Sequence, residues 1–277
     1  MEISILPSRF ERIINFDPEI SLYVTPGGNP WDYTRRMELR KGAIIAHRGA
    51  SALVKFENTI EAFEKAIEIG ADAMEFDVRR TADGALVSFH DDSVSGRKIA
   101  DLTLDELQGL AGARGFAVPK VEEIFRMAKG RILLDIELKE TGYERELLEL
   151  ASKHLEAGDF VMKSFLDRAI ISIKRLDPRV RTGLLLGLEK PKEGFLRRIV
   201  ELFPGFRLAR SGADFVAPHY LLLRFGFLAR MRLRGIPVFV WTVNDPNMME
   251  DLIARGVHAI ITDRPELGLA FSPIGPA

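Results

Sequence analysis

Apolar runs alternate with helical patterns along most of the chain. Runs rich in branched apolar residues predict buried strands at residues 43–47, 71–78, 131–139, 160–164, 180–186, 213–217, 238–243 and 258–262. Apolar positions at helical spacing predict helices between them, at residues 58–69, 121–128, 145–154, 167–175, 196–202, 222–234 and 246–254. Because strands that alternate with helices form parallel sheets, eight such repeats predict an α/β fold, a (β/α)8 TIM barrel.

Three segments depart from this alternation. Residues 1–42 are too short and too rich in turn residues for a domain, so we expect an N-terminal arm. The barrel is expected at residues 43–270, followed by a short C-terminal tail at residues 271–277. Residues 91–119, after the second strand, contain the helical run DLTLDELQGLA, which predicts a small helical insertion within the barrel.

Length, charge and residue content narrow the class of protein. The 277 residues fit one barrel domain, since such barrels commonly run to ~250 residues. A net charge of −1 gives no general field for nucleic acid or an anionic membrane, although it allows a local basic site. Cysteine is absent, which excludes disulfides, thiolate catalysis and cysteine metal ligands.

No targeting or spanning segment is expected. The first 20 residues contain scattered acids and arginines and no uninterrupted apolar core, so they do not predict a signal peptide. No stretch approaches the ~18 uncharged apolar residues that a membrane span needs. We therefore expect a cytoplasmic protein with no nucleic-acid partner and no stable membrane insertion. The oligomeric state stays open.

Two acidic residues share one face of the second predicted strand. In the run AMEFDV, side chains alternate between faces, so Glu75 and Asp77 point away from the apolar Phe76. Carboxylates side by side on an apolar strand repel each other unless a cation lies between them. This spacing therefore predicts a cation site.

The third predicted strand carries further charges. The run ILLDIELK aligns Asp135, Glu137 and Lys139 on one face. Because a charged face on a buried strand must meet a polar site, Glu137 is a third carboxylate of that site and Lys139 a fixed positive charge. Asp135 lies one layer deeper, where a structural hydrogen-bonded role is favoured over metal ligation.

Two histidines lie close to these acids in the sequence. A lone histidine at a strand end, such as His47, is more often a hydrogen-bonded core residue than a catalytic one. The adjoining Arg48 and Gly49, and the similar context of His90, favour acid and base catalysis instead. Carboxylates, histidines and a lysine together suit phosphodiester chemistry.

In their order and spacing, the motifs resemble the glycerophosphodiester phosphodiesterase family. The matching segments are HRGAS from His47, ENT from Glu57, GADAMEFDV from Gly70, HDD from His90, IELK from Ile136, KSF from Lys163, VWTVND from Val240 and GVHAIITDRP from Gly256. The similarity covers about residues 43–268. It departs from the family pattern at Phe56, where proline is usual, and this affects loop rigidity more than chemistry.

The resemblance implies a reaction and a cofactor. It implies metal-dependent hydrolysis of small-molecule glycerophosphodiesters to a glycerol phosphate and an alcohol. A divalent cation, Mg²⁺ or Ca²⁺, is implied on Glu75, Asp77 and Glu137. His47 and His90 are implied as acid and base in a reaction through a cyclic phosphate, with no indication of which acts first.

Substrate contacts are expected from further residues. Arg48 can bind two phosphate oxygens at once, whereas Lys139 acts as a compact point charge. Glu57 is expected to point toward the site, while the neighbouring Asn58 caps the following helix. Trp241 is either plain core or, as the resemblance favours, an aromatic wall near the glycerol.

Other polar residues and other functions stay open. Lys163 and His219 lie at strand ends, where core and site roles are equally supported, whereas His154 and His258 are interpreted as structural or exposed. A lysophospholipase D fits the same motifs, and LLLRFGF at residues 221–227 would supply its apolar groove. A catalytically silent barrel that binds a phosphorylated ligand is the third hypothesis, and the intact histidines and carboxylates count against it.

Overall fold

The structure is a computed structural model that describes residues 39–187 and 200–271. Most of the expected N-terminal arm, most of the expected C-terminal tail and most of the helix expected at residues 196–202 lie outside these residues.

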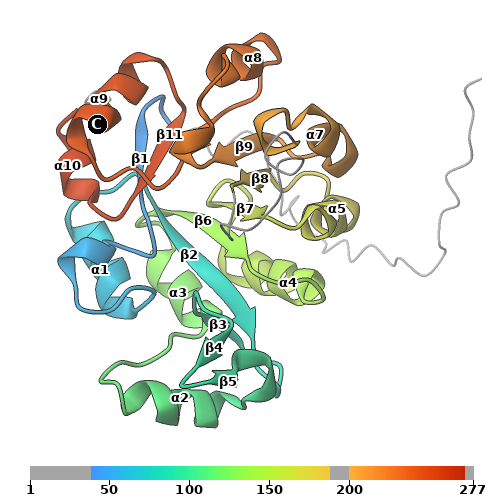
Figure 1. The fold of residues 1–277 in the computed structure, drawn as a ribbon. Coiled ribbons are helices and arrows are strands. Elements are labelled where there is room, and N and C mark those ends of the chain that lie inside the picture. The colour runs from blue at the N-terminus through green and yellow to red at the C-terminus, as the bar shows by residue number, and fades with distance from the viewer. Residues whose placement is uncertain (1–38, 188–199, 272–277) are drawn as a thin grey trace, which may run out of the picture. The chain divides into compact units, whose positions relative to one another are not determined.

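Parallel strands form the centre of the fold. They are β1 (Ala43–Ala46), β2 (Ala73–Arg80), β6 (Leu133–Leu138), β7 (Phe160–Ser164), β8 (Thr182–Leu186), β9 (Phe215–Pro218), β10 (Phe239–Val240) and β11 (Ala259–Thr262). They pair in the order β10-β11-β1-β2-β6-β7-β8-β9, and parallel bridges Val216–Val238 and His219–Trp241 join β9 to β10. The eight strands form a nearly closed TIM barrel, which confirms the predicted fold class (Figure 1).

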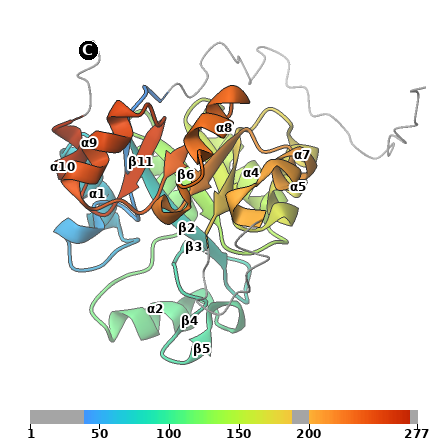
Figure 2. The same ribbon diagram turned by 45° about the horizontal axis from the view of Figure 1, so that its top comes forward.

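Helices follow the strands on the outside of the barrel (Figure 2). They are α1 (Ile60–Glu68), α3 (Val121–Ala128), α4 (Glu144–His154), α5 (Asp167–Leu176), α7 (Gly205–Ser211), α8 (Phe227–Leu233), α9 (Pro246–Ala254) and α10 (Pro265–Leu269). The short 3-10 turns are η1 (Ser51–Leu53) and η3 (Tyr220–Leu222). Within the described part of the chain, no helix has both the length and the apolar content to cross a membrane.

Some helix predictions differ from the structure. The helix expected at residues 222–234 begins only at Phe227, because Phe225 and Gly226 adopt positive φ angles of 51° and 67° that end any continuous helix. Helices α7 and α10 were not predicted. They have 7 and 5 residues, which is too short for a helical period to stand out.

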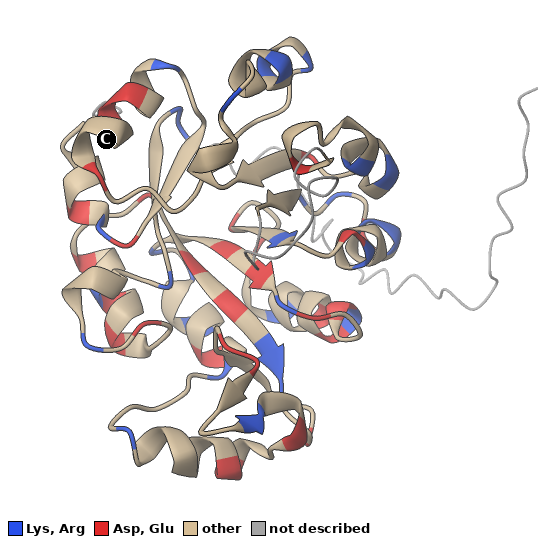
Figure 3. Ribbon diagram, in the orientation of Figure 1, with Lys and Arg blue, Asp and Glu red and all other residues tan. Residues whose placement is uncertain are grey.

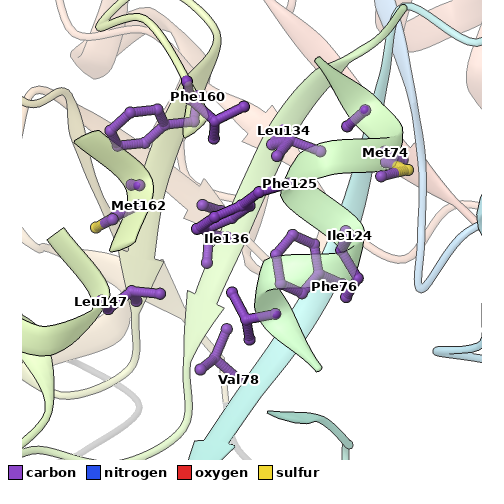
Figure 4. Packing of buried hydrophobic residues seen from close by; sticks show 14 of the residues in the cluster. Met74, Phe76, Val78, Ile124, Phe125, Leu134, Ile136, Leu147, Phe160 and Met162 are labelled. Atoms are coloured by element: carbon purple, nitrogen blue, oxygen red, sulfur yellow. The ribbon is translucent and has the colours of Figure 1, made fainter. Parts of the chain in front are cut away.

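The outer faces of β2 and β6 pack against helices (Figure 4). Phe76 on β2 lies edge to face with Phe63 of α1 and Phe125 of α3, at centroid distances of 5.9 Å and 6.3 Å. Leu134 and Ile136 on β6 are fully buried in the same cluster. Because helices fill this outer face, the alternate acidic positions of both strands face into the barrel.

Apolar side chains fill the barrel at the amino-terminal ends of its strands. Phe215 and Phe239 stack there with centroids 4.3 Å apart. Gly183 leaves the space for this pair, since a Cβ on it would lie 2.2 Å from the Phe215 ring. Ala43 and Ala73 belong to the same buried cluster. Polar side chains therefore gather at the opposite, carboxyl-terminal ends.

The segment after β2 forms a small unit, at the bottom of Figure 1. β3 (Leu86–Ser88) pairs antiparallel with β2, and the β4 (Ser93–Val94) and β5 (Arg97–Lys98) hairpin leads through η2 (Ile99–Asp101) to α2 (Leu104–Gly112). Thr103 and Glu106 close a capping box at the start of α2. The helix was predicted, but the strands were not, because two or three residues show no alternation.

Candidate active site

Three buried carboxylates converge on neighbouring strands. Asp77 on β2 is in register with Glu137 on β6, and Glu75 precedes Asp77 by one inward-facing position. One oxygen from each of the three lies within 4.8 Å of the others. Oε1 of Glu75 and Oδ1 of Asp77 are buried and accept no hydrogen bond. These oxygens suit a divalent cation, which prefers carboxylate ligands.

Lys139 bridges two of these carboxylates. Its Nζ lies 2.5 Å from Oε1 of Glu137 and 2.9 Å from Oδ1 of Asp77. The contact with Asp77 is an ion pair whose geometry does not make it a hydrogen bond. Burial opposes charge on Lys139, but both carboxylates raise its pKa above the ordinary value. Burial raises the pKa of Glu137 to about 7, against the attraction of Lys139. Burial also acts to raise the pKa of Asp77, but Lys139 and Arg48 outweigh it and hold that pKa well below its usual range.

A second ammonium group lies next to Glu75. Nζ of Lys163 on β7 donates to Oδ2 of Asp135 at 2.6 Å and lies 3.4 Å from Oε1 of Glu75. Burial raises the pKa of Asp135 to about 6, although Lys163 acts in the opposite direction. Asp135 therefore forms a buried ion pair, in keeping with a structural role, and Lys163 stabilises the base of the site.

His47 follows β1 and is oriented by a carboxylate. Its Nδ1 lies 2.6 Å from Oδ1 of Asp263, which also accepts a hydrogen bond from Ser51 at 3.1 Å. Asn244 donates to the other oxygen at 2.6 Å. Burial acts to raise the pKa of Asp263, but these hydrogen bonds outweigh it and lower the pKa to about 2. The sequence did not predict a role for Asp263 in orienting His47. The DRP motif that begins at Asp263, directly after the last strand, was a signal that could have indicated it.

His90 lies on the segment between β3 and β4. Its Nδ1 is 2.8 Å from Oδ1 of Asp91. Burial, together with the charges of Lys139 and Arg48, lowers the pKa of His90, which favours a neutral ring. Arg79 anchors the main chain here, since its Nε and Nη2 donate to the carbonyl oxygen of His90 at 3.0 Å and 2.7 Å. Sequence reasoning missed this role of Arg79.

The segment after β1 places Arg48 beside the carboxylates. Its main-chain nitrogen donates to Oε2 of Glu75 at 2.9 Å, and its Nε lies 3.3 Å from Oδ2 of Asp77. Its Nη1 donates to Oε1 of Glu57 at 2.7 Å. The next residue must be glycine, because a Cβ on Gly49 would lie 2.5 Å from the main chain of α1. Glu57 thus contacts the site through Arg48.

The structure corrects the expectation for Asn58. The residue that caps α1 is Thr59, whose hydroxyl accepts a hydrogen bond from the nitrogen of Ala62 at 3.3 Å. Asn58 instead donates from Nδ2 to Oδ2 of Asp77 at 2.8 Å and accepts from Ser88 at 2.9 Å. Its φ of 55° lies in the left-handed region that asparagine tolerates. This backbone turn is what aims the amide at Asp77.

Aromatic side chains form the wall on another side. Nε1 of Trp241 donates to the carbonyl oxygen of Ala217 at 2.7 Å, which fixes the indole. Phe165 and His219 lie edge to face with this indole at 5.6 Å and 5.0 Å. Gly187 leaves room for it, since a Cβ there would lie 2.8 Å from the ring. Burial lowers the pKa of His219.

These groups meet in a cavity of about 600 Å³ at the carboxyl ends of the strands, where the acidic positions of β2 and β6 also lie (Figure 3). Its lining includes His47, Arg48, Glu75, Arg79, His90, Glu137, Lys139, Lys163, Phe165, His219 and Trp241. Asp77 lies behind this lining, in contact with Arg48. Glu57 lines a smaller adjoining pocket that also includes His90 and Asp91. His154 and His258 are not part of the lining of the larger cavity.

A family model agrees with this arrangement. The model of the glycerophosphoryl diester phosphodiesterase family matches residues 47–267. The chain belongs to the glycerophosphoryl diester phosphodiesterase family. The family is metal-dependent, and the buried acidic group of this phosphodiesterase is able to bind a metal ion.

Proteins of known sequence or structure match this phosphodiesterase over most of their own length. A glycerophosphodiester phosphodiesterase from Caldanaerobacter subterraneus subsp. tengcongensis is 32% identical over 244 residues, which cover 82% of this chain and 96% of that protein. A crystal structure of a glycerophosphodiester phosphodiesterase from Parabacteroides distasonis has a TM-score of 0.71 at 30% identity and covers 83% of this chain and 97% of its own. A lysophospholipase D from Homo sapiens is 24% identical and covers 80% of this chain and 83% of that protein.

Proposed function

We propose that this phosphodiesterase hydrolyses glycerophosphodiesters to a glycerol phosphate and an alcohol. The observation that carries this proposal is the meeting of His47 and His90 with Glu75, Glu137 and Lys139 in one cavity. Two histidines can supply an acid and a base, and the charged groups can bind a metal ion and a phosphodiester.

Glu75, Asp77 and Glu137 are the proposed ligands of one divalent cation, either Mg²⁺ or Ca²⁺. Held by these three carboxylates, such an ion would supply Lewis acidity for phosphoryl transfer. Arg48 presents a planar guanidinium to the phosphate, and Lys139 presents a point charge. The proposal assigns both to the non-bridging oxygens.

The two histidines are proposed to move the protons. Because Asp263 engages Nδ1 of His47 and Asp91 engages Nδ1 of His90, Nε2 of each ring is left for the substrate. One Nε2 removes the proton of the glycerol 2-hydroxyl as that oxygen attacks phosphorus, and the other protonates the departing alcohol oxygen. The resulting cyclic phosphate is opened by water, with the two rings exchanging roles.

Residues around the reacting groups position the substrate. Trp241, held by its hydrogen bond to Ala217, is proposed as the wall against the glycerol carbons. Glu57 is proposed to act on substrate through the guanidinium of Arg48 that it binds. The proposed catalytic unit is the barrel of residues 43–270 with the insertion at residues 91–119, in a cytoplasmic enzyme of glycerol and lipid metabolism.

The test of this function is hydrolysis of glycerophosphocholine by chelator-treated protein before and after addition of Mg²⁺ or Ca²⁺. We expect choline release only with metal. His47→Ala and His90→Ala should each lower kcat by about two to four orders of magnitude. His154→Ala is the matched control. The His154 ring lies outside the cavity, and its Nε2 is 3.1 Å from Oε1 of Glu122. A folded wild-type protein without activity in either ion would favour the silent barrel instead.

A second substrate separates the acid from the base. A glycerophosphodiester with a p-nitrophenol leaving group needs no protonation of that group when its bond to phosphorus breaks. The histidine variant that retains near wild-type activity on this substrate, but not on glycerophosphocholine, has lost the acid of the first step. Equal losses on both substrates in both variants would contradict the division of roles.

A further inference from the structure

Six large apolar side chains stand exposed on the segments that follow β8 and β9. Two of them, Val200 and Leu233, are 45% and 88% exposed. The other four are Phe203, Phe206, Leu221 and Phe225, with exposed fractions of 52%, 76%, 52% and 74%. Scattered exposed apolar residues are normal, whereas a contiguous group marks a contact with protein or lipid. We call these four residues the apolar rim.

Contacts of Arg230 bring together the two segments that carry the apolar rim. Its guanidinium lies 4.4 Å from the ring centroid of Phe203. It also donates hydrogen bonds to the carbonyl oxygens of Phe225 and of Leu202, the latter at 2.6 Å. Phe206 lies three residues after Phe203, across the start of α7. One arginine therefore joins the two segments that carry the rim.

The backbone holds Phe225 outward. Its φ of 51° is unfavourable for a bulky residue, and the next residue, Gly226, has a φ of 67°. Such strain persists only where the surroundings over-determine it, and the hydrogen bond from Arg230 to the carbonyl of Phe225 is one such constraint. An exposed phenyl ring held at this energetic cost is typical of a binding surface.

The charge around the apolar rim is positive. Helices α7 and α8 each carry two arginines and no acidic residue, as Figure 3 shows in blue. Arg207 on α7 is paired with Asp167 and Glu201, so the unpaired positive charge lies on other arginines. Arg210 and Arg224 are exposed, and neither forms an ion pair with any residue in the described ranges. Because the whole chain has a net charge of −1, this basic character is local. It complements a surface of negative charge.

The apolar rim begins at the mouth of the cavity. The main-chain nitrogen of Leu221 donates to Nδ1 of His219 at 3.3 Å, and His219 lines the cavity. The ring of His219 in turn contacts Trp241. Leu221, at one end of the rim, thus lies beside the cavity that holds the histidines.

We propose that the apolar rim docks this enzyme on the surface of an anionic phospholipid membrane and delivers single-chain phosphodiester lipids to the cavity. The inference rests on the proposed function, since it names a substrate class for the same site. Aromatic side chains with arginines are the composition that binds the boundary between headgroups and acyl chains. Such peripheral contact agrees with the expectation of no stable membrane insertion.

Vesicle binding tests the surface. Full-length protein is sedimented with vesicles of phosphatidylcholine alone or mixed with phosphatidylglycerol. We expect binding to the mixed vesicles and weaker binding to the neutral ones. Phe206→Ser with Phe225→Ser should weaken it about tenfold or more, and Arg210→Gln with Arg224→Gln should remove the preference for anionic lipid. Leu53→Ser is the matched control, because Leu53 is 38% exposed but lies on η1.

Activity separates docking from catalysis. The variant with both phenylalanines replaced should hydrolyse soluble glycerophosphocholine as wild type does, but should lose activity on lysophosphatidylglycerol presented in vesicles. Wild-type protein that does not sediment with anionic vesicles, or a double variant that sediments equally, would overturn the proposal. A wild-type dimer that the same variant dissociates would overturn it as well, because the rim would then join two copies. Vesicle binding without hydrolysis of either substrate would support docking and refute the proposed function.

Discussion

Replacing Lys139 by methionine should tighten the binding of a divalent cation while removing most of the catalysis. Nζ of Lys139 lies 2.5 Å from Oε1 of Glu137 and 2.9 Å from Oδ1 of Asp77. Both oxygens belong to the buried group that can hold a metal ion. An ion on the proposed ligands would therefore compete with the ammonium for the same two carboxylates.

The magnitude follows from the charges involved. Two unit charges about 4 Å apart interact by about 4 kcal/mol at an effective dielectric constant of ~20, and a dication doubles this repulsion. Lys139→Met relieves only part of this repulsion. In wild type the lysine side chain can move away from the ion, and burial raises the pKa of Glu137 to about 7, which limits the negative charge that the ion would meet. We expect a gain of about 1–3 kcal/mol, which is roughly a 5- to 150-fold lower Kd.

Calorimetric titration of metal-free protein with Mg²⁺ or Ca²⁺ measures this change. Lys139→Arg is the matched control, because it keeps the charge and should keep a Kd near that of wild type. The kcat of Lys139→Met should fall by about two to three orders of magnitude, since the phosphate loses a fixed cation. A folded Lys139→Met variant that binds metal as weakly as wild type, or more weakly, would refute the competition.

Other predictions concern stability and substrate binding. The hydrogen bonds to Asp263 lower its pKa to about 2 from 3.8, so its contribution to stability is present above about pH 4 and lost as the pH falls through 2. Asp263→Asn should lower the free energy of unfolding in urea by about 1–2 kcal/mol near neutral pH. A difference between variant and wild type that does not change with pH would contradict this. Asn58→Ala should cost about 2–4 kcal/mol, because buried hydrogen bonds to Asp77 are lost and the φ of 55° becomes strained, whereas Asn58→Gly should recover about 1 kcal/mol in thermal unfolding. Equal losses in the two variants would show that strain plays no part. Gly187→Ala should raise KM about tenfold with less effect on kcat, because the added methyl lies 2.8 Å from Trp241, and an unchanged KM would argue against the aromatic wall.

Local pattern was sufficient for the barrel and for the shared faces of its strands. Each strand packs its outer face against helices, so apolar residues recur at least at alternate positions along it. The alternation on β2 depends only on the geometry of an extended chain. For this reason Glu75 and Asp77 could be placed on one face, and Glu137 with Lys139 on another, before any contact between the two strands was known.

Partners and turns were decided by the tertiary structure. Asp263 lies 216 residues from His47, and the two meet only because β11 pairs with β1 as the barrel closes. Asn58 was predicted to cap a helix, but its backbone turn directs its amide to a hydrogen bond with Asp77 instead. Pattern could not show either, because periodicity reports which face a residue occupies and not which distant residue it meets.

The sequence by itself determined the fold class and the residue types of a phosphodiester site. Only the tertiary structure decided which charges form ion pairs. It places Lys139 between two carboxylates and Lys163 between Asp135 and Glu75. The physical reason is that a buried charge is stable only beside an opposite charge, and strands far apart in the sequence supply that neighbour.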